Sequence, residues 1–435
     1  MVKLKNRILS LFTAAVIAIA GLGIIPGLSV KAGAADDKPI IVSLGDSYSS
    51  GEGIEPFYGQ DKPTKEKVKD QDWLAHRSEK AWGGMLTLDG VDGTMKDNRG
   101  TNWFFAAASG AEIKHINSKF KKSYNYDGKT GSRKLDPQIK IFDSIPAGTV
   151  DYVTLTLGGN DVGFVDIMSA AVMKPKTVTE AVKNGVEKFE SSVRAKLKKA
   201  YKAIEKAAGK QATIIVAGYP HIMNDKGFTI ENVPLFGSIT VSADTAKLIN
   251  EWTDVLNDRI KALVGECKGE GMNICFVSVT SAFAGHEAYT ENEYINGVIL
   301  KSRAQDLVSG SMISGYSLHP NAKGAKAYAS VVQKKINALE KEKSGKAENK
   351  TGITVKASSK DGKVTLKWDA VEGASKYRVY EYADGKATLL KTVRKTATSI
   401  SGLSAGTDHK YIVTAYVDKK WSAIDEKSAV TVKVK

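Results

Sequence analysis

Residues 39–53, PIIVSLGDSYSSGEG, decide the fold of the longer part of this chain. The run from Pro39 to Leu44 is apolar and rich in β-branched residues, which is typical of a strand buried on both faces of a parallel sheet. Ser47 follows this run directly, between glycines. In doubly wound sheets, ligands bind beyond the carboxyl ends of the strands, so Ser47 is a candidate nucleophile. Taken alone, the segment is equally compatible with an ordinary Ser/Gly turn.

The pattern of strand followed by helix continues through the first three quarters of the chain. Three further apolar runs predict buried strands: 152–157, 213–217 and 274–279. Amphipathic patterns predict three long helices: 186–208, 243–264 after the candidate cap Ser242, and 321–339. This alternation predicts a doubly wound α/β sheet.

Length and charge limit the classes of protein. A chain of 435 residues is long enough for two or three folding units. The net charge is +15, and the four basic residues of 1–34 leave +11 on the remainder. No basic stripe is interleaved with aromatic residues, so we expect no nucleic-acid partner; the charge instead favours adhesion to anionic cell walls or acidic polymers.

The N-terminal segment 1–34 resembles a secretion signal. Three basic residues precede a long apolar stretch, which Gly and Pro interrupt, and Ala32-Gly33-Ala34 supplies small residues for cleavage. The alternative is an uncleaved membrane anchor, because the stretch approaches the length of a membrane span. We expect cleavage, a secreted mature protein starting near Ala35, and no membrane span after cleavage.

The last quarter of the chain has a different pattern. Residues 340–352 are charged, lack large apolar side chains and predict a linker between a domain at 35–339 and another at 353–435. Beyond the linker, apolar residues alternate with polar ones, as in 364–368, which predicts an antiparallel sandwich. Trp368, Tyr377 and the late Leu403…Gly406…Tyr411 pattern resemble a fibronectin type III domain. We expect Trp368 and Tyr377 to lie in its core rather than on a binding face.

The chain has two cysteines, Cys267 and Cys275, which flank a flexible turn. Export would permit a local structural disulfide between them; the alternative is two unpaired thiols.

Residues 402–406, GLSAG, satisfy the nucleophile-elbow pattern of α/β-hydrolases. That motif requires a strand–turn–helix context, whereas Ser404 lies between two predicted sandwich strands, so we expect no catalytic role for it.

Three further segments carry candidate groups for the same site as Ser47. Asn160 follows a buried strand within LGGNDVGF and could donate to an oxyanion. Gly110, within ASGAE, could present a bare backbone N–H. His319 precedes the last predicted helix and is the histidine whose context suggests a general base.

Together these segments resemble the SGNH (GDSL-type) hydrolase family, in its secreted lipase/esterase branch. The matching blocks, in the family's order, are GDSYSSGEG, ASGAE, GGNDVGF and HPNAKG, and His76-Arg77-Ser78 adds a further likeness. The resemblance spans about 39–335 and implies a three-layer, flavodoxin-like α/β fold. It also implies that Ser47 is the nucleophile and His319 the base. Ser47, Gly110 and Asn160 would form the oxyanion hole, with no metal or cofactor.

One position departs from the family pattern. The family commonly has an aspartate three residues before the histidine, and here that position is Tyr316. Some members of the branch use a main-chain carbonyl instead, so we expect the Tyr316 carbonyl to orient His319. Asp306 is a more distant substitute for the missing carboxylate.

The resemblance implies a secreted serine esterase that acts on carboxylic esters of lipids or small alcohols. Two alternatives stay open. A carbohydrate O-deacetylase would suit the appended domain, which is then a candidate contact to polysaccharide or cell wall. A catalytically inactive adhesion protein would suit the loss of the aspartate, although the presence of Ser47, Gly110, Asn160 and His319 together argues against it.

Overall fold

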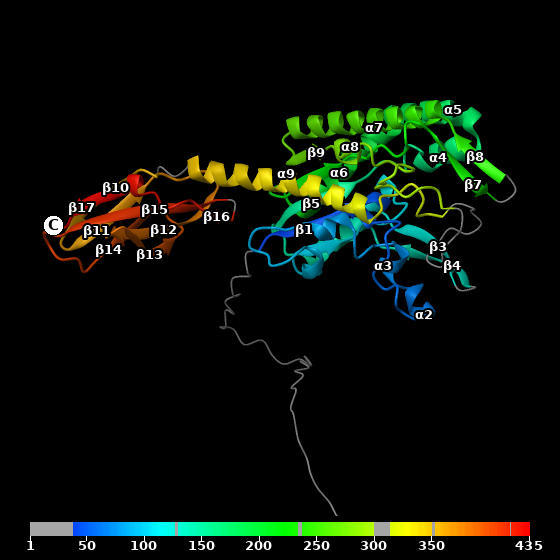
Figure 1. Cartoon of the computed structure of the whole chain (residues 1–435). Helices are drawn as coiled ribbons and strands as arrows, with labels where there is room; N and C mark the ends of the chain where they lie inside the picture. The colour runs from blue at the N-terminus through cyan, green and yellow to red at the C-terminus, as the bar shows by residue number, and fades with distance from the viewer. Residues whose placement is uncertain (1–37, 127–128, 234–236, 300–313, 350–352, 418) are drawn as a thin grey trace, which may run out of the picture. The chain divides into compact units, whose positions relative to one another are not determined.

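The computed structural model describes residues 38–126, 129–233, 237–299, 314–349, 353–417 and 419–435 (Figure 1). The predicted signal segment and Asp306 lie outside these ranges. Within them, no helix is both long and apolar enough to cross a membrane.

A five-stranded parallel sheet forms the centre of the N-terminal domain (Figure 1). Its strands are β1 (Ile40–Gly45), β2 (Trp103–Phe105), β5 (Val150–Thr156), β6 (Thr213–Ala217) and β9 (Ile274–Val277). They lie in the order β2-β1-β5-β6-β9, and every neighbouring pair is parallel. Counted along the chain, this is the 2-1-3-4-5 order of flavodoxin-like folds, whose switch point lies between the first and third strands. The doubly wound sheet is confirmed, and its switch point lies between β1 and β5.

Helices cover both faces of this sheet. Those before the last strand are α1 (Ser47–Ser50), α2 (Thr64–Lys67), α3 (Gln71–Leu74), α4 (Phe164–Met173), α5 (Val178–Lys188), α6 (Arg194–Ala208) and α7 (Ala243–Gly269). After it come α8 (Thr280–Phe283) and α9 (Ala322–Asn349). Ser242 caps α7 as predicted, because its Oγ accepts from the Thr245 N–H at 3.2 Å. Helix α9 continues to Asn349, through most of the predicted linker, since Glu and Lys are good helix formers.

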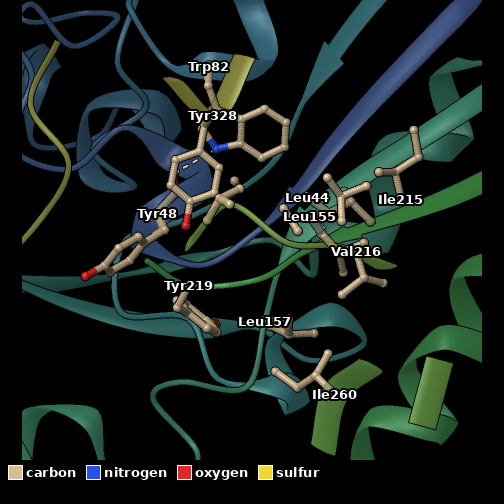
Figure 2. Close-up of a cluster of buried hydrophobic side chains, with 14 of the residues drawn as sticks. Leu44, Tyr48, Trp82, Leu155, Leu157, Ile215, Val216, Tyr219, Ile260 and Tyr328 are labelled. Atoms are coloured by element: carbon tan, nitrogen blue, oxygen red, sulfur yellow. Dashed lines mark hydrogen bonds between the residues drawn. The ribbon is translucent and has the colours of Figure 1, made fainter. Parts of the chain in front are cut away.

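The core beside the predicted nucleophile is aromatic (Figure 2). Tyr328 of α9 stacks on Trp82 at 5.7 Å, and the Trp82 indole N–H donates to the Tyr48 carbonyl at 2.9 Å. Tyr48 in turn packs edge-on against Tyr219, 5.3 Å away. These side chains are almost fully buried, so the residue after Ser47 is held rigidly from several directions.

Two hairpins extend from the layers. The first is β3 (Phe120–Tyr126) with β4 (Lys129–Leu135), and the second is β7 (Phe228–Val233) with β8 (Gly237–Val241). The first hairpin follows the segment that contains Gly110, so its residues come close to the candidate site.

The predicted disulfide is wrong, because both Cys267 and Cys275 are free thiols. Cys267 belongs to α7 and lies near Lys198 of α6, whereas Cys275 belongs to β9 and lies near Lys335 of α9. Burial raises the pKa of both thiols. The two thiols thus stay unpaired, although only seven residues separate them in the chain.

The C-terminal domain is an antiparallel sandwich. One sheet has β10 (Val355–Lys360), β11 (Lys363–Trp368) and β14 (Ala397–Ile400). The other has β12 (Ala374–Ala383), β13 (Lys386–Val393), β15 (Asp408–Val417), β16 (Lys420–Trp421) and β17 (Val430–Lys433). Trp368 and Tyr377 meet in its core at 5.5 Å, as predicted. Ser404 lies exposed in the turn between β14 and β15, which is not a nucleophile elbow.

Candidate active site

The carboxyl end of β1 delivers Ser47 to the switch point of the sheet. Gly45 has a φ of +116°, and a Cβ there would lie 2.3 Å from the Thr156 carbonyl oxygen, so only glycine fits. Asp46 then caps α1 by accepting from the Tyr48 N–H at 3.1 Å. Ser47 is the first residue of this helix and is buried except for a small accessible part.

The Asp46 carboxylate joins three strand ends. Besides the Tyr48 N–H, it accepts from the Thr156 hydroxyl at the end of β5, at 2.7 Å. Its second oxygen accepts from the Tyr219 hydroxyl, just beyond β6. Burial raises the pKa of Asp46 to about 6, although these hydrogen bonds act to lower it. One buried carboxyl group therefore fixes the loop that carries Ser47 to the end of β5 and to the segment that follows β6.

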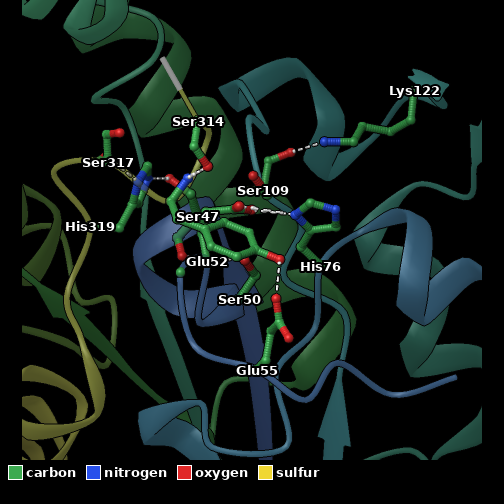
Figure 3. Close-up of polar contacts among 12 residues, drawn as sticks. Ser47, Ser50, Glu52, Glu55, His76, Ser109, Lys122, Ser314, Ser317 and His319 are labelled. Atoms are coloured by element: carbon green, nitrogen blue, oxygen red, sulfur yellow. Dashed lines mark hydrogen bonds and ion pairs between the residues drawn. The ribbon is translucent and has the colours of Figure 1, made fainter. Parts of the chain in front are cut away.

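Ser47 and His319 meet as the sequence predicts. His319 Nε2 lies 2.8 Å from Ser47 Oγ, although the two residues are 272 positions apart in the chain (Figure 3). This is the distance at which a histidine can take the proton of a serine hydroxyl.

The predicted partner of His319 Nδ1 is wrong in detail. The acceptor is the Ser317 carbonyl, at 2.9 Å, and not the Tyr316 carbonyl, which instead accepts from the Asn296 side chain at 3.2 Å. Within the described residues no carboxylate is hydrogen-bonded to this nitrogen. A main-chain carbonyl thus stands where a triad carboxylate would, one residue nearer to the histidine than expected.

The backbone at Leu318 explains the shift by one residue. Leu318 has a φ of +59°, a left-handed conformation that costs a non-glycine residue on the order of 1–3 kcal/mol. The turn folds the Ser317 carbonyl back onto the ring of His319. The strained residue is held by its contacts: the Tyr48 hydroxyl donates to the Leu318 carbonyl at 2.8 Å, and the Leu318 N–H donates to the Asn296 carbonyl at 3.0 Å.

Tyr316 has a structural role of its own. Its side chain is fully buried in a small cluster with Phe57 and Trp73, and its hydroxyl donates to Glu55 at 3.0 Å. The side chain therefore packs the loop that carries His319 rather than contacting the histidine nitrogen.

The predicted oxyanion hole has three hydrogen-bond donors: the N–H groups of Ser47 and Gly110 and the side-chain amide of Asn160. Among the described residues, no acceptor is paired with the N–H of Ser47 or of Gly110. Asn160 Nδ2 donates one hydrogen to the Ala111 carbonyl at 2.9 Å, which leaves its second hydrogen for another acceptor. The Asp161 carboxylate accepts from the Ile113 N–H at 2.9 Å, so the segments that carry Asn160 and Gly110 are tied together.

A buried hydrogen-bonded pair of a histidine and a glutamate lies next to this arrangement and was not predicted. His76 Nδ1 lies 2.8 Å from a Glu52 carboxylate oxygen, and both side chains are buried (Figure 3). Burial alone would raise the pKa of Glu52, but the pairing with His76 outweighs it and lowers that pKa to about 2. Glu52 stood inside the first matching block, yet nothing in the sequence showed which residue it would meet.

Comparisons with known proteins show which family the chain belongs to. Residues 43–327 match the model of the GDSL-like lipase/acylhydrolase family. A lipase of Streptomyces rimosus is 26% identical over 293 residues, which cover 67% of this chain and 84% of the relative. The chain belongs to this family. It is accordingly a hydrolase of ester bonds.

Two solved structures are similar to parts of this lipase/acylhydrolase. An extracellular lipase from Streptomyces rimosus aligns with 68% of this chain and 99% of its own, at 22% identity and a TM-score of 0.48. A fibronectin type III-like protein from Clostridium thermocellum aligns with 19% of this chain and 88% of its own, at 21% identity and a TM-score of 0.17. The strands of the C-terminal region themselves show that it is all-β.

An apolar cavity of about 220 Å³ opens beside His319 in the lipase/acylhydrolase domain. Helix α4 forms one wall, and the loop that carries His319 forms the other. The lining residues are Phe164, Val165, Met168, Ser169, Val172, Val298, Ser314, Gly315, Ser317, Leu318 and His319. Val165 is 63% exposed at this cavity, which is unusual for a large apolar side chain. Within the described ranges, no group of three or more His, Cys, Asp or Glu residues could hold a metal ion.

The buried environment of His319 lowers the pKa of its ring. Loss of water around the ring lowers the pKa of His319 below its ordinary 6.5. The more distant Glu52 and the backbone carbonyls of Ser317 and Gly315 only partly oppose this. A base must be neutral to act, so the acidic limb of kcat/KM should have its midpoint below pH 6.5. Nuclear magnetic resonance titration of the histidine ring signals would measure the same pKa directly.

The His319→Gln variant identifies the signal, because one titrating histidine resonance disappears. Asp46 also titrates near this range, with a pKa of about 6, but it contributes no histidine signal. A pKa of 7 or above for His319 would contradict this account and would indicate a carboxylate at Nδ1.

Proposed function

We propose that the chain is an exported serine esterase that forms an acyl-enzyme on Ser47. The observation that carries the proposal is the 2.8 Å hydrogen bond between Ser47 Oγ and His319 Nε2 at the switch point of the sheet. The nucleophile, its base and three donors come from four separate segments of the chain. An inactive adhesion domain would have no reason to keep a serine and a histidine from distant segments within hydrogen-bond distance.

The reaction would proceed in two halves. Ser47 Oγ attacks the ester carbonyl carbon while His319 Nε2 takes the hydroxyl proton. The oxygen that becomes negative accepts from the N–H groups of Ser47 and Gly110 and from the Asn160 amide. His319 then gives its proton to the alkoxide of the departing alcohol. Water attacks the acyl-Ser47 ester with His319 again as base, and the carboxylic acid leaves as Ser47 regains its proton.

The histidine becomes a cation during each half, and the Ser317 carbonyl oxygen supports it. A carbonyl is an uncharged acceptor, so it fixes the tautomer with the proton on Nδ1 without bringing a formal negative charge. Glu52 supplies negative charge from farther away and acts to raise the pKa of His319. Orientation and charge, which an aspartate would provide together, are thus supplied by two separate groups.

Ser47→Ala should abolish hydrolysis of p-nitrophenyl butyrate, because it removes the nucleophile. Loss of a nucleophilic serine that acts together with its histidine costs roughly 10⁶-fold in kcat. Ser404→Ala is the matched control, since Ser404 lies in a G-x-S-x-G sequence of the sandwich, and it should keep wild-type turnover. Turnover that survives in the folded Ser47→Ala protein would rule out the proposed mechanism.

We propose further that the cavity between α4 and the His319 loop receives the acyl chain of the substrate. Its apolar walls favour longer acyl groups, since each buried CH₂ contributes about 0.8 kcal/mol, or roughly fourfold in kcat/KM. Activity should therefore rise from p-nitrophenyl acetate through butyrate to hexanoate. The same preference would separate a lipase or esterase from a carbohydrate O-deacetylase, which removes only acetyl groups.

Ser169→Trp tests this assignment. Ser169 is exposed at the wall of the cavity, so the indole would fill the space without disturbing the core. In this variant kcat/KM should no longer rise from p-nitrophenyl acetate to p-nitrophenyl hexanoate, whereas kcat/KM on the acetate should stay at the wild-type level. Asp166→Trp, on the same helix but away from the cavity, should behave as wild type. Highest activity on acetylated xylan in the wild-type enzyme, with no chain-length gain, would favour the deacetylase.

Export is supported by the leader and by a relative. Residues 1–34 have the composition of a cleaved signal, and the solved Streptomyces rimosus lipase is described as extracellular. N-terminal sequencing of protein from the culture medium should give a start near Ala35. An intact N-terminus in the membrane fraction would contradict export and favour an anchor. The contact of the sandwich with polysaccharide or cell wall stays a prediction.

A further inference from the structure

The proposed oxyanion donor Gly110 belongs to a tight turn of residues 108–111. The Ala111 N–H donates to the Ala108 carbonyl at 3.0 Å, which closes a four-residue β-turn. Gly110, the third residue, has a φ of +75°, as a type II turn requires. The peptide unit between Ser109 and Gly110 is therefore the central one of the turn. In a type I turn this central unit would be rotated, and its N–H would face the other way.

A lysine side chain from outside the turn binds this central peptide unit. Lys122 Nζ donates to the Ser109 carbonyl at 2.8 Å (Figure 3). Lys122 lies on β3, in the hairpin that follows the turn, and its ammonium group passes 5.2 Å from the ring of Phe120. A Cβ built on Gly110 would lie 4.0 Å from the same Nζ, so the charge is close to the donor residue itself.

The rest of the turn has independent anchors. The Ser109 N–H donates to the Ala75 carbonyl at 2.9 Å, and the Ser109 side chain interacts with the buried Glu52 carboxylate. Arg77 holds the preceding residues, because its Nε donates to the Ala107 carbonyl at 2.9 Å. Removing the ammonium of Lys122 would thus leave the turn in place and affect chiefly its central peptide unit.

We propose that Lys122 is a positioning residue for the oxyanion hole, acting through the Ser109–Gly110 peptide. A trans peptide is planar, and its C=O and N–H point in opposite directions. Holding the Ser109 oxygen therefore fixes the direction of the Gly110 N–H. A cation on that oxygen also draws electron density from the peptide and makes the N–H a stronger donor, as in cooperative hydrogen-bond chains. This inference rests on the proposed function, in which Gly110 stabilises the transition state.

The expected effect is confined to the chemical step. The oxyanion exists in the transition state and not in the bound ester, so weakening its donor lowers kcat and leaves KM unchanged. Removal of an oxyanion donor costs roughly 10²–10³ in kcat, and Lys122 only aids such a donor, so we expect a loss of about tenfold.

The experiment compares three variants of the full chain on p-nitrophenyl butyrate. Lys122→Met keeps the apolar stem and removes the ammonium, so kcat should fall about tenfold. Butylboronic acid forms a tetrahedral adduct that mimics the oxyanion. Its inhibition constant should rise by a similar factor in this variant. Lys122→Arg keeps the charge and should restore most of kcat. Lys121→Met is the matched control, because Lys121 is exposed and alternates to the other face of β3.

Wild-type kcat in Lys122→Met, or a rise in KM with kcat unchanged, would overturn the inference. If the Met variant melts below the assay temperature, Lys122→Gln and Lys122→Arg are compared instead, and equal kcat in the two would overturn it as well. The Ser47→Ala variant distinguishes a failure of the proposed function from a failure of the role of Lys122. Turnover that survives there defeats the proposed function, whereas an inactive Ser47→Ala beside a fully active Lys122→Met defeats the role of Lys122 alone.

Discussion

The hydrogen bonds of the buried Asp46 carboxylate hold the site together. One oxygen receives the Tyr48 N–H and the Thr156 hydroxyl, and the other receives the Tyr219 hydroxyl, so the ends of β1, β5 and β6 meet at a single group. The parallel sheet brings these ends to one edge, but it does not fix the turn that follows β1. Asp46 does so, and it thereby sets the position of the next residue, Ser47.

A second constraint positions the base. His319 reaches Ser47 from a loop between β9 and α9 rather than from a strand, and a strained residue, Leu318, shapes that loop. The strain brings the Ser317 carbonyl to the histidine nitrogen, and buried contacts from Tyr48 and Asn296 compensate for it. A backbone carbonyl can hold the ring in this way whatever the side chain at 316 is, which explains how the family's aspartate can be absent while the serine and histidine remain.

Much of this arrangement follows from the sequence. The buried runs that became β1, β5, β6 and β9 have few alternatives in a parallel sheet. The switch-point rule points to the loops after β1 and β5, two adjacent strands, and these loops carry Ser47 and Asn160. The short strand β2 has too few residues to show a pattern. The acceptor at His319 depends on one backbone angle at Leu318, and no periodicity encodes that angle. The predicted disulfide failed because spacing along the chain does not show how the side chains of Cys267 on α7 and Cys275 on β9 lie relative to each other. Lys122 lies on a hairpin whose contact with the Ser109 carbonyl is purely tertiary.

The central claim is that Ser47 is a nucleophile activated by His319. Reaction of the folded protein with a fluorophosphonate, followed by peptide mass mapping, tests it most directly, since the reagent forms a stable adduct only with an activated serine. The account predicts one adduct, on the peptide that contains Ser47, and no adduct in the same time when His319 is replaced by glutamine. An unmodified Ser47 in the wild-type protein, or equal modification without His319, would contradict it.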